Sequence, residues 1–364
     1  MKYLISGGGT GGHIYPALAI VDEIKKNDKD AEILYVGTQS GLESKLVPKA
    51  GVEFKTIRVK GIPRKINKDS FIALKELLHG LHGSSKIIKD FKPDIVIGTG
   101  GYVCGPVVLQ GYRNKAKTMI HEQNAFPGIT NKILSRFVDR VAVTFDESIK
   151  YFKDTSKVIK TGNPIRGEIF NIDKDKAYKE LDLVKDKPVI LSFGGSGGQS
   201  SLNNAMKYVV ENLKDVDYQL IHVTGERFYS QYMKELENVD IDESKIKILP
   251  YLYKMPEALN IADIIVTSAG AITLAEVSSV GIPSILIPKG YTAENHQEYN
   301  ARSFEKNEAG VVILEKDLTG IKLEEEIRKL LSDPGKLENM RKNSKAMSNR
   351  NASKEIYDII GGLI

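Results

Sequence analysis

Short apolar runs alternate with amphipathic, helix-like segments along almost the whole chain. This alternation is typical of βαβ units, in which buried parallel strands are joined by helices. The first half predicts strands at residues 3–6, 32–36, 54–59, 94–98, 118–121 and 140–144. The second half predicts strands at residues 189–193, 219–223, 245–249, 264–267, 284–287 and 310–313. We therefore expect an α/β protein with two doubly wound parallel sheets.

The pattern is interrupted near residues 161–167, where an Asn-Pro step disfavours helix and two glycines relax the backbone. A length of 364 residues also fits two domains better than one. We expect an N-terminal domain over residues 1–163 and a C-terminal domain over residues 164–343. We expect residues 344–364 to form either a helix that crosses back to the first domain or a surface helix, and we favour the crossing.

Two of the predicted strands run directly into glycine-rich turns that open a helix, Gly7-Gly-Gly-Thr-Gly-Gly-His13 and Gly194-Gly-Ser-Gly-Gly-Gln199. Each turn presents backbone N–H groups at the positive end of a helix dipole, which suits an anion such as a phosphate. The first turn also fits the dinucleotide pattern G-x-G-x-x-G. That use needs a carboxylate at the end of the second strand, where the sequence is Tyr35-Val-Gly-Thr-Gln39. The dinucleotide interpretation is therefore disfavoured.

Other polar or glycine-rich segments follow predicted strands, at the edge where α/β sheets bind ligands. In the first half these are Gly98–Pro106 and His121–Asn124. In the second half, Ser268–Glu276 begins a helix whose N–H groups suit a diphosphate, and Glu294–Asn300 offers amides for sugar hydroxyls. Glu276 is placed to hold a ribose diol, or only to complement the helix dipole.

His13 directly follows the first turn, beside the expected anion site. A role in proton transfer and a purely structural role are about equally compatible with that position. His79 and His82 lie one helical turn apart without further nearby ligands, so we expect no metal site.

Composition narrows the classes further. No run approaches the roughly 18 apolar residues of a membrane span. The single cysteine, Cys104, excludes an intramolecular disulfide and suits a reducing compartment. The net charge of +5 suits an anionic substrate or membrane surface but is too small to indicate nucleic acid as a partner.

One predicted helix, Ser70–Gly83, is apolar around much of its circumference. Its apolar side chains and the basic residues before it form a candidate membrane patch of Phe71, Ile72, Leu74, Leu78, Arg64, Lys65 and Lys68. Basic residues around an apolar patch suit a protein that rests on an anionic bilayer. A core helix with solvated lysines at its ends fits the same pattern.

Several segments occur together in the order found in one enzyme family. They are Gly7–His13, His121–Asn124, Gly162–Arg166, Gly194–Ser196, Gly270–Glu276 and Asn295–Gln297. Over nearly its whole length the chain resembles the family 28 glycosyltransferases of bacteria that make lipid II from lipid I. The resemblance implies the GT-B fold, with two Rossmann-like domains facing a central cleft, the acceptor on the first and the nucleotide sugar on the second.

The resemblance implies an inverting transfer of N-acetylglucosamine from UDP-GlcNAc to the 4-hydroxyl of the MurNAc-pentapeptide of lipid I, without a cofactor. It also implies a peripheral protein on the cytoplasmic face of the bacterial membrane, with other cell-wall synthesis proteins as further partners. Other GT-B enzymes, such as a diacylglycerol glycosyltransferase or a UDP-GlcNAc 2-epimerase, share this plan, as would a non-catalytic UDP-sugar sensor.

Roles for individual residues follow from the same resemblance. His13 is the first candidate for the base that deprotonates the acceptor hydroxyl, and Glu122 is the second. The expected UDP-GlcNAc contacts are Thr10, Gly11, Gly12, Asn124, Arg166, Ser196, Leu252, Ala271, Ile272, Thr273, Leu274, Ala275, Glu276 and Gln297. The expected acceptor-diphosphate contacts are Gly9, Thr10, His13, Gly100, Gly101 and Tyr102. Gly197 departs from the family, which usually has glutamine or a similar residue there, so a phosphate contact must come from backbone or from Gln199.

Overall fold

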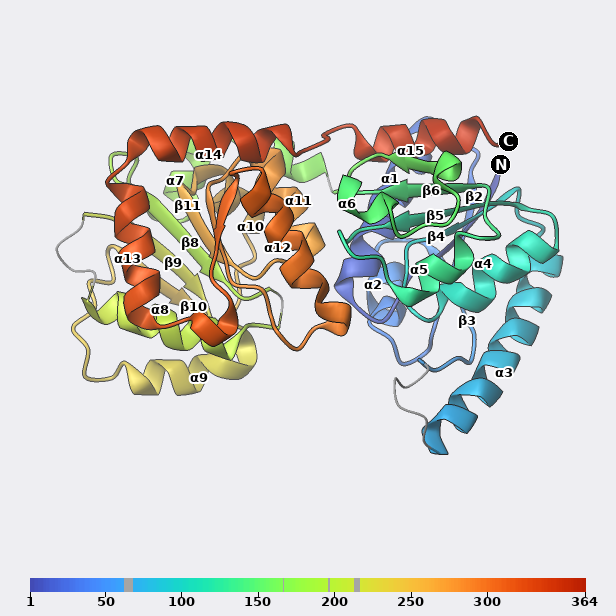
Figure 1. Ribbon diagram of the computed structural model, residues 1–364, viewed down its shortest axis with the longest axis horizontal. Helices are drawn as coiled ribbons and strands as arrows, with labels where there is room; N and C mark the ends of the chain where they lie inside the picture. Colours follow the sequence, from blue (N-terminus) through green and yellow to red (C-terminus); the bar gives the residue numbers. More distant parts are fainter. Residues whose placement is uncertain (62–67, 166, 196, 213–216) are drawn as a thin grey trace. The chain divides into compact units, whose positions relative to one another are not determined.

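The computed structural model contains two parallel β-sheets, each covered by helices on both faces (Figure 1). It describes residues 1–61, 68–165, 167–195, 197–212 and 217–364. These divide into two units, Met1–Arg166 with Asn349–Ile364, and Gly167–Ser348. The last helix of the chain is therefore grouped with the first sheet.

The first sheet has the strand order β3-β2-β1-β4-β5-β6-β7, and every neighbouring pair is parallel. Its central strands are almost entirely apolar, because helices bury them from both sides. The strands are β1 (Lys2–Ser6), β2 (Glu32–Gly37), β3 (Glu53–Thr56), β4 (Ile95–Gly98), β5 (Lys117–Glu122), β6 (Arg140–Val143) and β7 (Val158–Lys160).

Helices bury both faces of this sheet. One core joins it to α1 (Gly11–Asn27), α2 (Glu43–Lys49) and the C-terminal α15 (Ala352–Gly361), which packs on α1. The other core joins it to α3 (Lys68–Phe91), α4 (Cys104–Arg113) and α5 (Ile129–Leu134). The short α6 (Asp146–Ile149) and the 3-10 turn Thr155–Lys157 connect the last strands.

The second sheet has the order β10-β9-β8-β11-β12-β13 and is also parallel throughout. Its strands are β8 (Val189–Phe193), β9 (Gln219–Val223), β10 (Ile246–Leu249), β11 (Ile264–Thr267), β12 (Ser284–Leu286) and β13 (Gly310–Val312). Helices α8 (Ser200–Asn212), α9 (Glu226–Glu235), α13 (Gly320–Leu331) and α14 (Pro334–Ala346) share one core with it.

The remaining helices of the second unit are α7 (Lys174–Glu180), α10 (Met255–Ile261), α11 (Ala271–Val280) and α12 (His296–Lys306). Contacts link α7 to α10, α10 to α11, and α12 to β13. Short 3-10 turns lie at Gly167–Phe170, Ala293–Asn295 and Glu315–Asp317.

Each predicted strand is present, with small shifts at its ends. The predicted strand at residues 54–59 ends earlier, at Thr56. The Ile57 N–H still donates to the Gly37 carbonyl of β2 at 3.0 Å, and Ile57 and Val59 pack in the core with Ile88. Strand β7 was not predicted: it has three residues, is only partly buried and ends in a lysine.

Both strand orders reverse direction at the centre of the sheet, between β1 and β4 and between β8 and β11. Loops that leave adjacent strands at such a switch point diverge to opposite faces, which opens a crevice at the carboxyl ends of the strands. The predicted glycine-rich turns follow β1, β4 and β8, and the Ser268–Gly270 segment follows β11.

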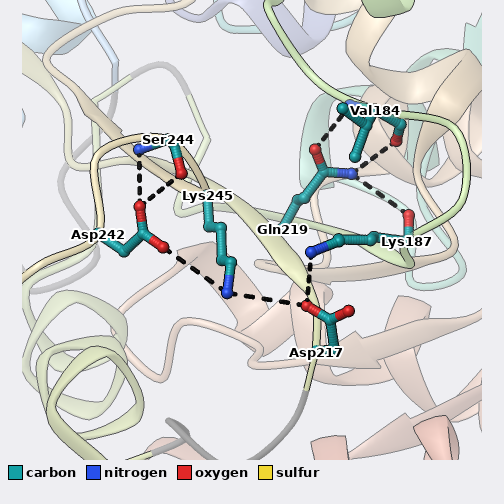
Figure 2. A network of polar contacts seen from close by, with 7 residues as sticks. All are labelled: Val184, Lys187, Asp217, Gln219, Asp242, Ser244 and Lys245. Atoms are coloured by element: carbon teal, nitrogen blue, oxygen red, sulfur yellow. Dashed lines mark hydrogen bonds and ion pairs between the residues drawn. The ribbon is translucent and has the colours of Figure 1, made fainter.

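The amino ends of the strands in the second sheet carry a different polar network (Figure 2). The buried Gln219 side chain accepts from the Val184 N–H at 2.7 Å and donates to the Val184 carbonyl at 2.7 Å. Asp217 binds Lys187 at 2.9 Å and lies 3.8 Å from Lys245. These contacts attach the segment before β8 to β9 and leave the carboxyl edge to the glycine-rich turns.

Candidate functional site

The turns after β1 and β4 lie against each other in the first unit. The Gly8 N–H donates to the Gly100 carbonyl at 3.3 Å, and a methyl group at Gly101 would lie 2.2 Å from the Gly8 carbonyl oxygen. Gly101 also has φ +85°, which a residue with a side chain rarely adopts. The Tyr102 ring lies beside Gly9. Two glycine-rich turns therefore form one continuous surface at the switch point.

A buried carboxylate, Glu43, stabilises the first glycine-rich turn, and the sequence analysis did not predict it. Glu43, at the start of α2, is fully buried and accepts hydrogen bonds from the Gly9 N–H at 3.1 Å and the Thr38 N–H and hydroxyl at 3.0 and 2.7 Å. Methyl groups on Gly8 or Gly41 would lie 2.6 or 2.2 Å from its oxygens. Gly8 and Gly41 therefore leave room for the buried Glu43 carboxylate, because a side chain at either position would overlap with it.

The backbone amides of the first turn divide into two groups. Those of Gly8 and Gly9 are used within the protein, so the N–H of Gly9 is directed at Glu43 and not at the surface. Helix α1 begins at Gly11, its N-cap Thr10 makes no side-chain capping bond, and its first turn holds no acidic residue. The amides that suit an anion are therefore those of Thr10–Gly12.

His13 lies in the first turn of α1 and is only partly buried. Its Nδ1 lies 3.1 Å from the carbonyl oxygen of Thr99 and 3.2 Å from Oε1 of Gln123. Both partners can only accept a hydrogen bond at those atoms, so Nδ1 carries the hydrogen and Nε2 presents a lone pair. The imidazole is thus held in the tautomer that accepts a proton at Nε2.

Gln123 joins His13 to a second, buried histidine. Its Nε2 donates to the Thr99 carbonyl at 2.8 Å and to Nδ1 of His121 at 3.0 Å. His121 in turn donates from Nε2 to the Gly162 carbonyl at 2.9 Å. Burial lowers the pKa of His121 to about 4, so it is neutral near pH 7 and can accept at Nδ1. These hydrogen bonds fix the orientations of the His121, Gln123 and His13 side chains.

Glu122, the second candidate base, has a different environment. Its buried carboxylate accepts from the N–H and side-chain amide of Asn124 at 3.0 and 3.1 Å. It also accepts from the Gly128 N–H at 3.1 Å and from Asn131 Nδ2 at 2.8 Å. Four donors on one buried carboxylate hold the loop after β5 in place. This geometry favours His13 over Glu122 as a proton acceptor.

In the second unit the turn after β8 has the backbone conformation that its glycines predict. Gly195 and Gly198 have φ +77° and +69°, and the Gly198 N–H donates to the Gly195 carbonyl at 2.9 Å. Gln199 is buried and donates to the Ile287 carbonyl at 3.2 Å and to Glu315 at 2.9 Å. A side chain at Gly197 would meet open space, with nothing within 4 Å.

Two charged residues that the sequence did not predict as part of the site contact this turn, Glu315 through Gln199 and Lys289 through Gly198. Glu315 accepts from Ser201 Oγ at 2.5 Å and from the Gly290 N–H at 2.7 Å, besides Gln199. Burial raises the pKa of Glu315, but these hydrogen bonds and the charge of Lys289 lower it, and the net shift is downward. Lys289 Nζ donates to the Gly198 carbonyl at 2.9 Å.

The N-terminus of helix α11 is a second place where backbone N–H groups suit an anion. It begins at Ala271 after the N-cap Gly270, with no side-chain cap and no acidic residue in its first turn. Gln297 lies close by, with Nε2 4.0 Å from a methyl group placed on Gly270 and Oε1 accepting from the Lys289 N–H at 3.0 Å. Thr273 and Glu276 are partly exposed, whereas Leu274 is fully buried and packs in the protein interior.

The remaining predicted site residues are distributed as follows. Leu252 is nearly buried just after β10, and Ala275 and Ile272 are partly exposed on α11. Arg166, Ser196, Arg64 and Lys65 lie outside the described residues. Among the described residues, no three His, Cys, Asp or Glu side chains come together in a way that would hold a metal ion.

The apolar side chains predicted on α3 are exposed. Phe71, Leu74 and Leu78 retain 74, 53 and 61% of their accessible surface, and Ile72 retains 48%. Figure 1 shows the first turns of α3 extending away from the rest of its unit. The alternative of a core helix is therefore wrong for these residues. In the ranges that the structure describes, no helix has the length and apolar character needed to cross a membrane.

Two Rossmann-like parallel sheets, each with glycine-rich turns at its switch point, define a protein of the GT-B class. Residues 3–143 match the glycosyltransferase family 28 N-terminal domain, and residues 189–356 match the glycosyltransferase family 28 C-terminal domain. The chain belongs to glycosyltransferase family 28. The predicted family, fold class and enzyme class are thereby confirmed.

Individual relatives match over almost their whole length. A Finegoldia magna protein named UDP-N-acetylglucosamine–N-acetylmuramyl-(pentapeptide) pyrophosphoryl-undecaprenol N-acetylglucosamine transferase is 51% identical, covering 100% of this chain and 98% of its own. A protein of the same name from Acetivibrio thermocellus is also 51% identical, with coverage of 99% and 97%.

Solved structures show the same fold. The crystal structure of Acinetobacter baumannii MurG has a TM-score of 0.79 at 25% identity and covers 100% of both chains. The S. aureus MnaA–UDP co-structure has a TM-score of 0.72 at 16% identity, covering 100% of this chain and 98% of its own. At that identity the second likeness concerns the fold alone.

Proposed function

We propose that this protein transfers N-acetylglucosamine from UDP-GlcNAc to the 4-hydroxyl of the MurNAc-pentapeptide of lipid I, which forms lipid II. The observation that carries the proposal is the 51% identity, over the whole chain, to a transferase whose name specifies this donor sugar and this pyrophosphoryl-undecaprenol acceptor. His13 on the first unit, and an uncapped helix N-terminus on each unit, are features that such a reaction can use.

His13 is the proposed base. Its Nε2 takes the proton of the acceptor hydroxyl while that oxygen forms the new bond to the anomeric carbon of the donor. The bond from the anomeric carbon to the diphosphate breaks, and its electron pair leaves with UDP. Thr99 and Gln123 stabilise the imidazolium that results, because both accept from Nδ1–H.

The leaving diphosphate gains negative charge in this step, and α11 is placed to stabilise it. The first N–H groups of the helix, at Ala271–Thr273, have no partner within the helix, and together with the helix dipole they favour an anion without any movement of side chains. Glu276, one turn further along, is the proposed contact for the ribose, and Gln297 for the sugar. The amides of Thr10–Gly12 are the proposed contact for a diphosphate on the first unit.

The exposed apolar stripe of α3 supports a place at the membrane. Phe71, Leu74 and Leu78 are spaced by three and four residues, so they share one helix face. Apolar side chains with neighbouring lysines suit the surface of an anionic bilayer, where a polyprenyl-linked acceptor resides. We propose peripheral association with the cytoplasmic leaflet, with other cell-wall synthesis proteins as further partners.

A transfer assay with labelled UDP-GlcNAc and a short-chain lipid I analogue tests the proposal. We expect label to appear in the lipid product and no turnover of UDP-GlcNAc without the acceptor. Turnover of the donor alone would indicate an epimerase, and donor binding without any transfer would indicate a sensor. Either result would contradict the proposed function.

A further inference from the structure

Lys289 is a half-buried cation that no carboxylate neutralises directly. It follows β12, and its Nζ donates to the Gly198 carbonyl at 2.9 Å. Among the ion pairs of the described residues, none within 4.0 Å includes Lys289. The neighbouring carboxylate of Glu315 is occupied by Gln199, Ser201 and the Gly290 N–H.

The surroundings of Lys289 favour an anion. Burial lowers its pKa, the neighbouring Arg227 lowers it further, and Glu315 acts in the opposite direction, so the net shift is downward. A half-buried cation beside another cation is costly unless a counter-charge compensates it fully, and the Glu315 carboxylate is already engaged by Gln199, Ser201 and Gly290. An anion bound near Nζ would relieve both the desolvation and the repulsion.

Three loops from neighbouring strands meet at this point. A methyl group on Gly195, after β8, would lie 3.5 Å from Ser268 Oγ, after β11, and 3.9 Å from Lys289 Nζ, after β12. The ammonium therefore borders the glycine turn from the side of β12. The Gly197 position contributes no side chain, and the Lys289 ammonium contacts this turn through the Gly198 carbonyl.

We infer that Lys289 binds the diphosphate of the nucleotide-sugar donor and stabilises it as it leaves. The inference rests on the proposed function, in which the second unit binds UDP-GlcNAc. One N–H of the ammonium holds the Gly198 carbonyl and shapes the turn, and the other two can reach phosphate oxygens. The site then prefers a nucleoside diphosphate over the bare nucleoside.

The test compares UDP and uridine binding to the full-length protein by calorimetry. We expect Lys289→Met, which keeps the aliphatic stem, to weaken UDP binding about ten-fold or more and to change uridine binding less than about two-fold. Lys289→Gln should behave likewise, and Lys289→Arg should recover most of the UDP affinity. Lys322→Met on α13 removes one exposed charge as a control and should leave both affinities unchanged.

The outcomes separate this inference from the proposed function. Equal UDP affinity in wild type, Lys289→Met and Lys289→Gln would overturn the role of Lys289, whatever the transfer assay shows. Equal loss of uridine and UDP binding would also overturn it, because that pattern indicates damage to the unit. UDP binding that depends on Lys289, in a protein that transfers nothing to lipid I, would support the inference and contradict only the proposed reaction.

Discussion

Oε1 of Gln123 lies 3.2 Å from Nδ1 of His13, and the other end of the same amide bonds the buried, neutral His121. Gln123 thus links the proposed base, His13, to the fixed side chain of His121 and so helps to orient the His13 imidazole. We expect Gln123→Met to lower kcat about ten-fold, the lower end of the loss seen when a residue that orients a metal-binding histidine is replaced. KM for UDP-GlcNAc should change little, because the donor contacts proposed on α11 are untouched.

Steady-state kinetics over a range of pH checks this prediction. His13→Ala should lower kcat further, by about a hundred-fold or more, because it removes the base itself. Gln110→Met provides the matched control, since Gln110 is another buried glutamine of the same unit, on α4. A kcat for Gln123→Met equal to that of the control would show that Gln123 does not position His13.

Gly100 is the second residue that determines where His13 lies. Its φ is +106°, and a methyl group there would lie 2.7 Å from Nδ1 of His13. We expect Gly100→Ala to lower stability by about 2 kcal/mol through backbone strain and to reduce kcat by displacing the imidazole. Gly105→Ala, in the first turn of α4, should be neutral or slightly stabilising, since its nearest neighbour would be 3.7 Å away. Wild-type kcat in Gly100→Ala would contradict this account.

The strand pattern and the glycine turns were predictable because both depend on local sequence. Buried parallel strands must be apolar, and a strand that runs into several glycines at a helix start is typical of an anion-binding turn. The position of His13 beside the first turn followed from the same local argument.

The contacts that complete the site depend on tertiary structure and were not predictable. Glu43 approaches Gly9 from α2, and nothing in its own segment marks it as buried. Gln123 reaches His13 because the loop after β5 has the conformation that the hydrogen bonds of Glu122 stabilise. Lys289 follows β12 at the carboxyl edge of the sheet, and that position could have marked it as a candidate site residue. A single lysine after a strand is common, however, and only its contact with the glycine-rich turn distinguishes this one.

Glu43 yields a stability prediction. Glutamine in its place would direct an N–H₂ group at a backbone N–H or at the Thr38 groups, all of which now donate to the carboxylate. We expect Glu43→Gln to lower the free energy of unfolding by about 2 kcal/mol, the cost of buried polar groups left unsatisfied. Urea denaturation measures the change. Glu53→Gln, on the exposed edge strand β3, is the control, and an equal effect of the two variants would contradict a supporting role for Glu43.

The apolar stripe of α3 yields a binding prediction. Replacing Phe71 and Leu78 by serine removes two of the most exposed apolar side chains and should reduce binding to anionic vesicles about ten-fold or more, at unchanged thermal stability. Reversing the charges of Arg64, Lys65 and Lys68 should weaken the same binding, and more strongly at low salt. Ile321→Ser, at an exposed apolar position on α13, is the control. Vesicle sedimentation that does not distinguish these variants from wild type would remove α3 from the membrane contact.

Two buried histidines predict how stability depends on pH. Burial lowers the pKa of His121 to about 4 and that of His222, on β9, to about 3, whereas an exposed histidine titrates near 6.5. Between these values the unfolded chain binds protons that the folded protein does not, so the free energy of unfolding falls as the pH decreases below about 6.5. Each histidine accounts for about 2 kcal/mol of loss between pH 7 and pH 5.

Urea denaturation of wild type and of His222→Gln at the two pH values isolates one of these contributions. We expect the variant to be less stable at pH 7, because it disturbs a fully buried position, but to lose about 2 kcal/mol less than wild type on acidification. Ser192→Ala removes the hydroxyl that contacts His222 Nδ1 at 3.1 Å while leaving the histidine, so it should keep the full pH dependence. If His222→Gln loses as much stability as wild type between pH 7 and pH 5, protonation of His222 is not a source of the acid sensitivity.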